Sequence, residues 1–182
     1  MPPATCSTIG PDLFTVRLFL IRHAHAVAEA ASDAVRPLSE RGRQTTAHAS
    51  SFFRQNGVLR PGQIWHSPLV RAYETASALA TGLEIDVPLV ETDGLLPGDD
   101  PALMAARLAE YPPVHDLALI GHQPHLSHLA TLLIRGKPQP NAFHFKKSAV
   151  LALRRADQLH PKTGLPRWRV AWHFSPEMLL EG

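Results

Sequence analysis

The sequence predicts an α/β fold, a three-layer α/β/α sandwich built around a mostly parallel central sheet. Short apolar runs that suit buried strands alternate along the chain with longer segments that carry helical signals. This alternation occurs four times and ends in two further strands, an order typical of a parallel sheet covered by helices. A length of 182 residues suits one such domain.

The first strand is expected at 13–21, where a dense apolar run (LFTVRLFLI) fits a strand that is buried on both faces. Pro88 interrupts a later strand, so that strand is placed at an edge of the sheet. The elements after the first strand are expected, in chain order, as a helix at 39–53, a strand at 63–66, a helix at 68–81, a strand at 85–90, a helix at 101–110, a strand at 117–120, a helix at 125–134, and strands at 149–154 and 167–174.

Capping residues mark the ends of two of these helices. Ser39 is available as the N-cap of the helix at 39–53, and Gly57 lies just beyond its expected end. Ser67 and Pro68 form a second start signal, with the serine as N-cap and the proline at the first helical position. This start places Arg71 in the first turn of the second helix.

Composition and charge limit the class of protein. A formal net charge of +2 predicts no binding of nucleic acid, and no apolar run approaches the roughly 20 residues that cross a bilayer. Residues 1–12 are expected to form a flexible leader without the features of a signal peptide, and 13–182 a single domain. Cys6 is the only cysteine, which predicts a reducing compartment, the cytoplasm.

Polar residues follow three of the expected strands at the point where each strand ends. Arg22 and His23 come after the first strand, Arg71 follows the second, and His122 follows the strand at 117–120. Ligands of open α/β sheets bind beyond the carboxyl ends of the strands. These four residues are therefore expected to meet at one edge of the sheet.

Such a group of side chains suits the transfer of a phosphoryl group. Neutral imidazole is a competent nucleophile, and the planar guanidinium groups of Arg22 and Arg71 match phosphate oxygens. His122 can donate a further hydrogen bond and adds charge when it is protonated. The helix N-terminus at Ser67 is expected to contribute free N–H groups. Together these groups would stabilise a transferring phosphoryl group without a metal ion.

Several motifs of the chain resemble those of the histidine phosphatase (phosphoglycerate mutase-like) superfamily. Leu18–Ala24 (LFLIRHA) resembles its R-H-G signature, Ser67–Ala76 (SPLVRAYETA) its second block, and Gly121–His122 its third. The segments 33–42 (DAVRPLSERG) and 172–176 (WHFSP) are similar to those of the small phosphohistidine phosphatases of the SixA type. The resemblance extends from about residue 16 to residue 176.

The resemblance implies roles for individual residues. His23 would accept the phosphoryl group, while Arg22, Arg71 and His122 would form the phosphate pocket, with His122 also counted as catalytic. Ala24 departs from the usual glycine of the signature, and its methyl group is tolerable unless this position needs a positive φ.

The proton donor is the second departure from the family pattern. Many relatives carry a Glu in the loop after the third strand or an Asp after the second histidine, whereas here Gln123 follows His122. Asp93, Asp99 and Asp100 are candidates for the missing acid. A site without one suits an N–P bond better than a sugar phosphate, because imidazole leaves more readily than an alkoxide.

A metal site is an alternative use of the eleven histidines. His23 with His25, or His122 with His125 and His128, could supply imidazole ligands. No cysteine or clear carboxylate completes either set, so partly exposed histidines without a metal are predicted, and no cofactor is expected.

Two interpretations remain open for Arg36 and for the pair Lys146 and Lys147. Arg36 is expected at the rim of the pocket, where it either contacts substrate or pairs with Asp33. Lys146 and Lys147 are interpreted as a solvated basic turn, with a place near the pocket mouth or against an acidic partner as the alternative. A phosphate-recognition module without turnover is the non-enzymatic alternative, and the complete set of four site residues disfavours it.

The sequence thus predicts a phosphatase that needs no metal and works through a phosphohistidine intermediate. Its preferred substrate is expected to be a phosphorylated protein, such as a phosphohistidine signalling domain, because the short chain leaves the pocket open. A small phosphoester, either a sugar phosphate or a nucleotide, is the alternative. Inorganic phosphate is the expected product, and neither nucleic acid nor a membrane is an expected partner.

Overall fold

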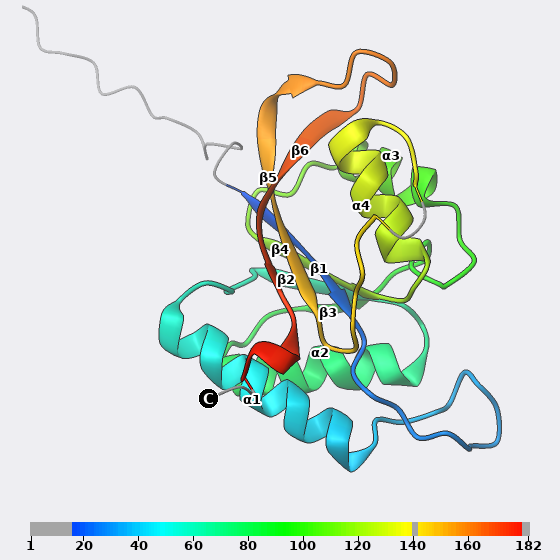
Figure 1. Cartoon of the computed structure of the whole chain (residues 1–182), viewed down its shortest axis with the longest axis vertical. Coiled ribbons are helices and arrows are strands. Elements are labelled where there is room, and N and C mark those ends of the chain that lie inside the picture. Colours follow the sequence, from blue (N-terminus) through cyan, green and yellow to red (C-terminus); the bar gives the residue numbers. More distant parts are fainter. Residues whose placement is uncertain (1–15, 140–141, 180–182) are drawn as a thin grey trace, which may run out of the picture.

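The computed structural model describes residues 16–139 and 142–179. The expected leader at 1–12 and the beginning of the expected first strand lie outside the described residues. The sheet has six strands in the order β3-β2-β4-β1-β5-β6 (Figure 1). The elements are β1 (Arg17–Arg22), α1 (Glu40–Asn56), β2 (Gln63–His66), α2 (Val70–Leu83), β3 (Leu89–Glu91), α3 (Pro101–Glu110), β4 (Leu117–Gly121), α4 (His125–Arg135), β5 (Val150–Leu159), β6 (Pro166–Phe174) and the 3₁₀ turn η1 (Pro176–Leu179).

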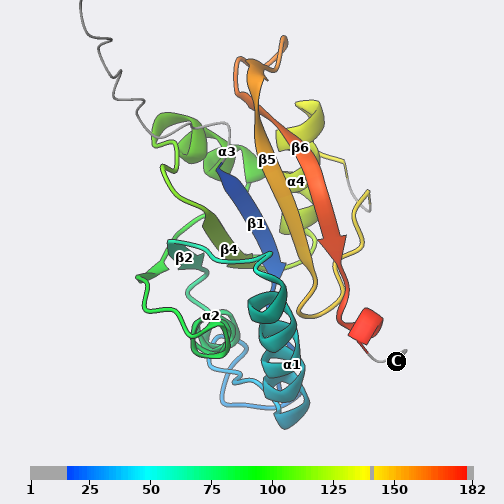
Figure 2. The same ribbon diagram turned by 90° about the vertical axis from the view of Figure 1, so that its left-hand side faces the viewer.

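The sheet is mostly parallel, as predicted. β1 pairs with β4, β4 with β2, and β2 with β3, all in parallel, whereas β5 runs antiparallel to both β1 and β6. The last two strands are longer than the sequence predicted. Their hairpin extends past the other strands at the end where the chain turns (Figures 1 and 2).

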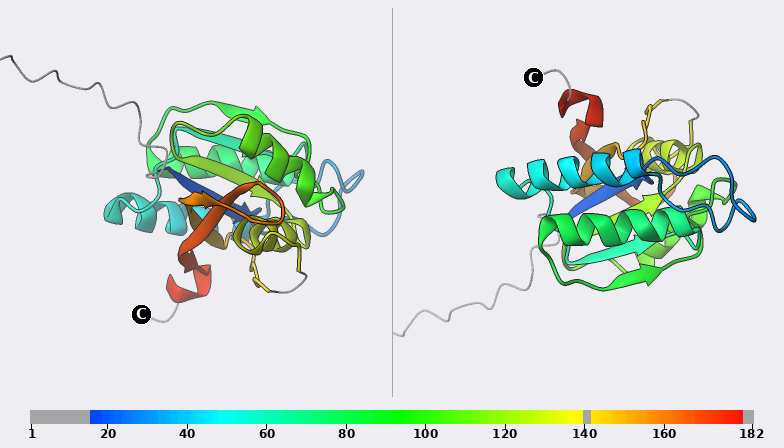
Figure 3. Two further views of the ribbon diagram at one scale, coloured as in Figure 1. Left: turned by 90° about the horizontal axis from the view of Figure 1, so that it is seen from above. Right: turned by 90° about the horizontal axis from the view of Figure 1, so that it is seen from below.

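Two apolar cores on opposite faces of the sheet make the three layers. Successive residues of β1 alternate between them: Leu18 and Leu20 pack with α3 and α4, and Phe19 and Ile21 with α1 and α2. All four side chains are buried, which confirms a strand covered on both faces. Seen from below, α1 and α2 lie side by side under the sheet (Figure 3).

Both ends of α1 agree with the sequence prediction. Ser39 is its N-cap and accepts a hydrogen bond from the Gly42 N–H at 3.1 Å. Gly57 ends the helix in the left-handed conformation, with φ 63°. Gly42 also lets the chain pack closely, because a Cβ there would collide with the backbone carbonyl of His25. The first turn of α1 thereby supports the loop that leaves β1.

The predicted start of α2 is wrong. The helix begins at Val70, with Leu69 at the N-cap and no side-chain cap. Ser67 instead directs its hydroxyl to Nε2 of His122, at 2.6 Å, which removes it from the capping position. The Val70 N–H donates to the Ala34 carbonyl, so the helix N-terminus is already satisfied in part by the preceding loop.

The third strand lies at the sheet edge, as Pro88 predicted, but it is shorter than expected. It begins at Leu89, directly after the proline. Among the described residues, no helix has the length and apolar character needed to cross a membrane.

Candidate functional site

Three neighbouring strands bring the predicted site residues to one edge of the sheet. β4 lies between β1 and β2, and all three end at this edge. The N–H of His23 donates to the Gly121 carbonyl at 3.0 Å, and the N–H of Ser67 donates to the Ile120 carbonyl at 3.1 Å. His23, His122 and Ser67 therefore lie side by side on adjacent strand ends.

The backbone holds His23 in one tautomer. Its Nδ1 is 2.7 Å from the Ala24 carbonyl oxygen, which can only accept, so Nδ1 carries the proton and Nε2 keeps its lone pair. Burial lowers the pKa of His23 to about 2, with further lowering by the charges of Lys147 and of His122. His23 is thus a neutral, buried imidazole with a defined nucleophilic nitrogen.

His122 is the neighbour of His23, with 4.7 Å between the ring centroids. Burial, followed by the charge of Arg71, lowers the pKa of His122 to about 3. With a pKa this low, His122 is neutral in the free protein near pH 7, so of the two contributions expected of it only the hydrogen bond remains. The Ser67 hydroxyl contacts Nε2, and Nδ1 has no partner among the described residues, so Nδ1 is available to a ligand and donates to it when the Ser67 hydroxyl donates to Nε2.

Arg71 comes from the first turn of α2, and its side chain is 6% exposed. Its two terminal nitrogens donate to Asp33, one to the backbone carbonyl at 2.7 Å and one to Oδ2 at 2.9 Å. These bonds to Arg71, and then those to Arg36, lower the pKa of Asp33. Because a guanidinium has five N–H groups, Arg71 keeps donors for a ligand.

Arg36 uses its polar atoms within the loop that follows β1. It donates to Asp33 Oδ1 at 2.9 Å and to the Val27 carbonyl at 2.8 Å. The pairing with Asp33 is thus the interpretation that the structure favours.

Arg22 also holds a place in the site. It donates to the Phe145 carbonyl at 2.7 Å, while its buried Nε has no partner among the described residues. Burial lowers the pKa of this guanidinium. Such an unpaired buried donor is costly unless an acceptor arrives.

Ala24 fits its position without strain. Apart from glycines, only Glu84 and Ser148 have a positive φ in the described part of the chain, so the methyl group meets no conformational penalty. The N–H of Ala24 donates to the Thr75 hydroxyl at 3.0 Å, and Thr75 donates in turn to the Arg71 carbonyl. This chain of hydrogen bonds ties the loop after β1 to α2.

Lys146 and Lys147 were interpreted together as a solvated basic turn, with a place near the pocket mouth as the alternative, and only Lys147 takes that alternative place. Lys146 is exposed and pairs with Glu177 at 2.9 Å, but the Nζ of Lys147 lies 3.3 Å from Nε2 of His23. The position of Lys147 in the chain was the signal that could have placed it near His23. This turn precedes β5, and the first residues of β5 pair with the end of β1.

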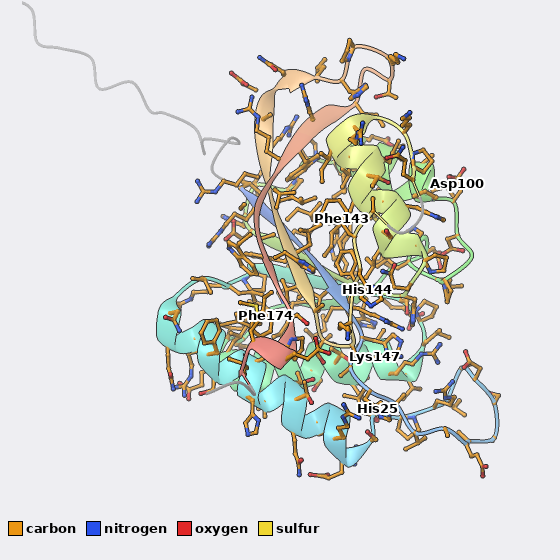
Figure 4. The ribbon with its side chains drawn as sticks, viewed as in Figure 1. His25, Asp100, Phe143, His144, Lys147 and Phe174 are labelled. Carbon is orange, nitrogen blue, oxygen red and sulfur yellow. The ribbon has the colours of Figure 1, made fainter. Side chains whose placement is uncertain are left out.

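The candidate proton donors do not join this group. Asp99 accepts from the Leu96 N–H at 2.8 Å, and Asp100 caps α3 through the Ala102 N–H at 2.9 Å. Figure 4 shows Asp100 well away from Lys147. Asp93 is exposed. Among the residues that the structure describes, its carboxylate has no hydrogen bond or ion pair to His23.

The histidines of the metal hypothesis do not form a cluster. In the part of the chain that the structure describes, no three His, Cys, Asp or Glu side chains are placed to share an ion. The expectation of partial exposure is wrong for His125, which is fully buried with both ring nitrogens unpartnered among the described residues, whereas His128 is partly exposed.

Comparisons with known proteins agree with this arrangement. The family model of the histidine phosphatase superfamily (branch 1) matches residues 18–96. No curated relative matches the sequence. The structure of the protein histidine phosphatase SixA complexed with tungstate is similar with a TM-score of 0.76 and 25% identity, covering 90% of this chain and 99% of that one.

Two further structures share the fold. A SixA protein from Agrobacterium tumefaciens, to which phosphohistidine phosphatase activity is assigned, has a TM-score of 0.70 and 20% identity, covering 88% of this chain and 98% of that one. A mycobacterial glucosyl-3-phosphoglycerate phosphatase has a TM-score of 0.62 and 20% identity, covering 88% of this chain and 100% of that one. The family model over residues 18–96 and the shared fold over most of the chain thus make this protein similar to the histidine phosphatase superfamily.

Proposed function

We propose that the protein is a phosphatase in which His23 carries the phosphoryl group between substrate and water. The observation that carries this proposal is the state of His23. Its Nδ1 proton is bound to the Ala24 carbonyl, its Nε2 lies 3.3 Å from the Lys147 ammonium, and the charges of His122 and Arg71 act on the same ring. A neutral nucleophile beside Arg22 and Arg71 suits attack on an anionic phosphorus centre.

The reaction has two steps. Nε2 forms a bond to phosphorus while the bond to the leaving atom breaks, and the electron pair departs with the leaving group. Water then attacks phosphorus, the Nε2–P bond breaks, and both protons of the water remain on the phosphate product. Arg22, Arg71 and Nδ1 of His122 would bind the phosphoryl oxygens in both steps. No metal ion is required by this scheme, and activity is expected to persist in EDTA.

A phosphohistidine protein is the proposed substrate. Asp33 is the carboxylate bound to this group of residues, and its ion pairs hold its pKa low, so it is a poor acid. A substrate whose leaving group departs without a proton gains most from such a site, and imidazole is such a leaving group once its other nitrogen is protonated. The similarity to the protein histidine phosphatase SixA supports the same choice.

A small phosphomonoester is the second candidate. The similarity to a glucosyl-3-phosphoglycerate phosphatase favours it, since that relative shares the fold over nearly the same length. The two candidate substrates differ in their need for a general acid, so the values of kcat/KM for the two substrates distinguish them.

A substrate panel tests the choice. We expect kcat/KM for a phosphohistidine-bearing domain to exceed that for sugar phosphates and nucleotides by about 100-fold or more, the usual contribution of a general acid. Phosphate release by the wild type, corrected for release by His23→Ala, measures the ratio. Faster turnover of a sugar phosphate than of the phosphohistidine domain would overturn the proposed substrate and leave the phosphatase mechanism standing.

Ser67→Ala tests the orientation of His122. The hydroxyl holds the ring of His122 through Nε2 and, when it donates there, leaves Nδ1 as donor, so its loss is expected to lower kcat about five- to tenfold, the effect of one ordinary hydrogen bond. Steady-state kinetics measure this change, and ¹⁵N NMR of the imidazole reports the tautomer. Unchanged kcat together with an unchanged tautomer would contradict the role given to Ser67.

A further inference from the structure

The turn before β5 places two consecutive lysines in different surroundings. Lys146 is exposed and ion-paired with Glu177 at the surface, whereas Lys147 is partly buried and reaches Nε2 of His23. Figure 4 shows Lys147 near the end of β1, close to His25. Lys147 therefore faces the nucleophilic nitrogen from the side at which a phosphoryl group has to arrive.

Backbone contacts fix this turn to the end of β1. The Ser148 N–H donates to the Arg22 carbonyl and the Arg22 N–H donates to the Ala149 carbonyl, both at 3.1 Å. Ser148 adopts φ 61°, a conformation that costs a non-glycine residue energy and persists only where the surrounding structure imposes it. The strained residue directly follows Lys147, which indicates that the position of this side chain is built into the fold.

The ammonium of Lys147 has more cations than anions around it. Burial, then Arg22, Arg71 and Arg36, lower the pKa of Lys147 to about 8, and the Asp33 carboxylate acts in the opposite direction. No ion pair to a carboxylate holds its ammonium in the described ranges 16–139 and 142–179. A partly buried ammonium without a carboxylate partner of its own is unfavourable until an anion binds beside it.

The turn that carries Lys147 borders an open groove. Lys147 and Ser148 also line a groove of about 330 Å³ that opens to solvent. A phosphoryl group that reaches Nε2 of His23 would displace the ammonium from that nitrogen and meet it as a hydrogen-bond donor.

We propose that Lys147 is a catalytic residue that binds a non-bridging phosphoryl oxygen, together with Arg22 and Arg71, during both transfers. This inference rests on the proposed function. Lys147 keeps its proton throughout, and the electron pair leaves with the leaving group in the first step and returns to Nε2 in the second. It thus stabilises the phosphoryl group by charge and gives no proton to the leaving atom. The site therefore selects substrates by how readily their leaving group departs.

Three variants test this role: Lys147→Met, Lys147→Arg and the matched control Lys146→Met on the same turn. The substrates are aryl phosphates whose phenols differ in pKa. Lys147→Met is expected to lower kcat/KM about 100-fold, and this factor should be the same for every phenol. Lys147→Arg should recover about tenfold of that loss, because the charge is kept. Lys146→Met should stay within about twofold of the wild type, as for an exposed ion pair.

Two further readouts separate charge from structure. Inhibition by orthovanadate should weaken in Lys147→Met and remain unchanged in Lys146→Met. The wild type should lose kcat/KM above about pH 8 as Lys147 loses its proton, and Lys147→Arg should not, since a guanidinium stays charged. Thermal unfolding confirms that each variant is folded before these comparisons are made.

The outcomes distinguish the possible failures. A loss in Lys147→Met that grows with the pKa of the phenol would make Lys147 a proton donor and overturn its assignment as an oxygen ligand. Wild-type kinetics and wild-type vanadate inhibition in Lys147→Met would exclude it from the site. If His23→Ala retained full activity, the proposed function itself would fail, whatever the lysine variants showed.

Discussion

Replacing His23 with alanine is expected to lower kcat by about 10⁴-fold or more, as removal of a nucleophile does in enzymes that form covalent intermediates. The buried imidazole is fixed by the Ala24 carbonyl, and the Gln123 side chain beside His122 is no substitute for it, because an amide nitrogen has no free lone pair. Steady-state phosphate release measures the loss.

Rapid quenching with a ³²P-labelled substrate tests the same residue directly. Wild-type protein should carry label in a bond that is labile in acid and stable in base, as expected of a phosphoramidate, and His23→Ala should carry none. His48→Ala, which changes an exposed histidine of α1, is the matched control and should keep both label and turnover. Label retained by the His23 variant would place the phosphoryl group on another residue.

The part of the site that lies on strand ends could be predicted from the sequence. Apolar runs mark the strands, and parallel strands end at a common edge, so Arg22, His23 and His122 had to converge if the alternation of elements was right. The register confirms this, because Arg22 pairs with Gly121, the residue before His122. Hydrophobic periodicity alone thus carries information about which polar residues meet.

The contacts made by Ser67 and Lys147 could not be predicted in the same way. Ser67 satisfies the local rule for a helix cap, but a tertiary contact with His122 takes its hydroxyl. Lys147 meets His23 only because β5 runs antiparallel to β1, and the alternation of elements did not specify that pairing. A side chain that serves a partner more than 100 positions away leaves no local pattern.

The acidic loop shows the opposite case, in which local chemistry explains the residues better than catalysis does. Asp100 directly precedes Pro101, a pattern typical of an N-cap followed by the first helical residue, and the structure uses it so. Asp99 closes its own loop on the Leu96 N–H. Both carboxylates are candidate acids only because the family pattern requires one, and their sequence context already indicates turns.

Arg71→Lys is expected to lower kcat/KM about 10²- to 10³-fold, which corresponds to roughly 3–4 kcal/mol of transition-state stabilisation. A guanidinium can bind Asp33 with two N–H groups and still present others to a phosphoryl oxygen, whereas an ammonium with three donors cannot span both partners. Inhibition by inorganic phosphate should weaken in parallel with kcat/KM, because the same donors would bind the product.

Asp33→Asn separates the two duties of this arginine. The Asp33 side chain is 63% exposed, and its backbone carbonyl still binds Arg71 in the variant, so kcat/KM is expected to fall only about two- to threefold. If Arg71 serves mainly to anchor the loop after β1, Arg71→Lys and Asp33→Asn should lower the thermal unfolding temperature together and leave phosphate inhibition unchanged. If it binds the phosphoryl group, phosphate inhibition should weaken strongly in Arg71→Lys alone. The Asp33→Asn change would also remove a negative charge beside the pocket, so tighter phosphate inhibition in that variant would identify the Asp33 carboxylate as a competitor for the same guanidinium.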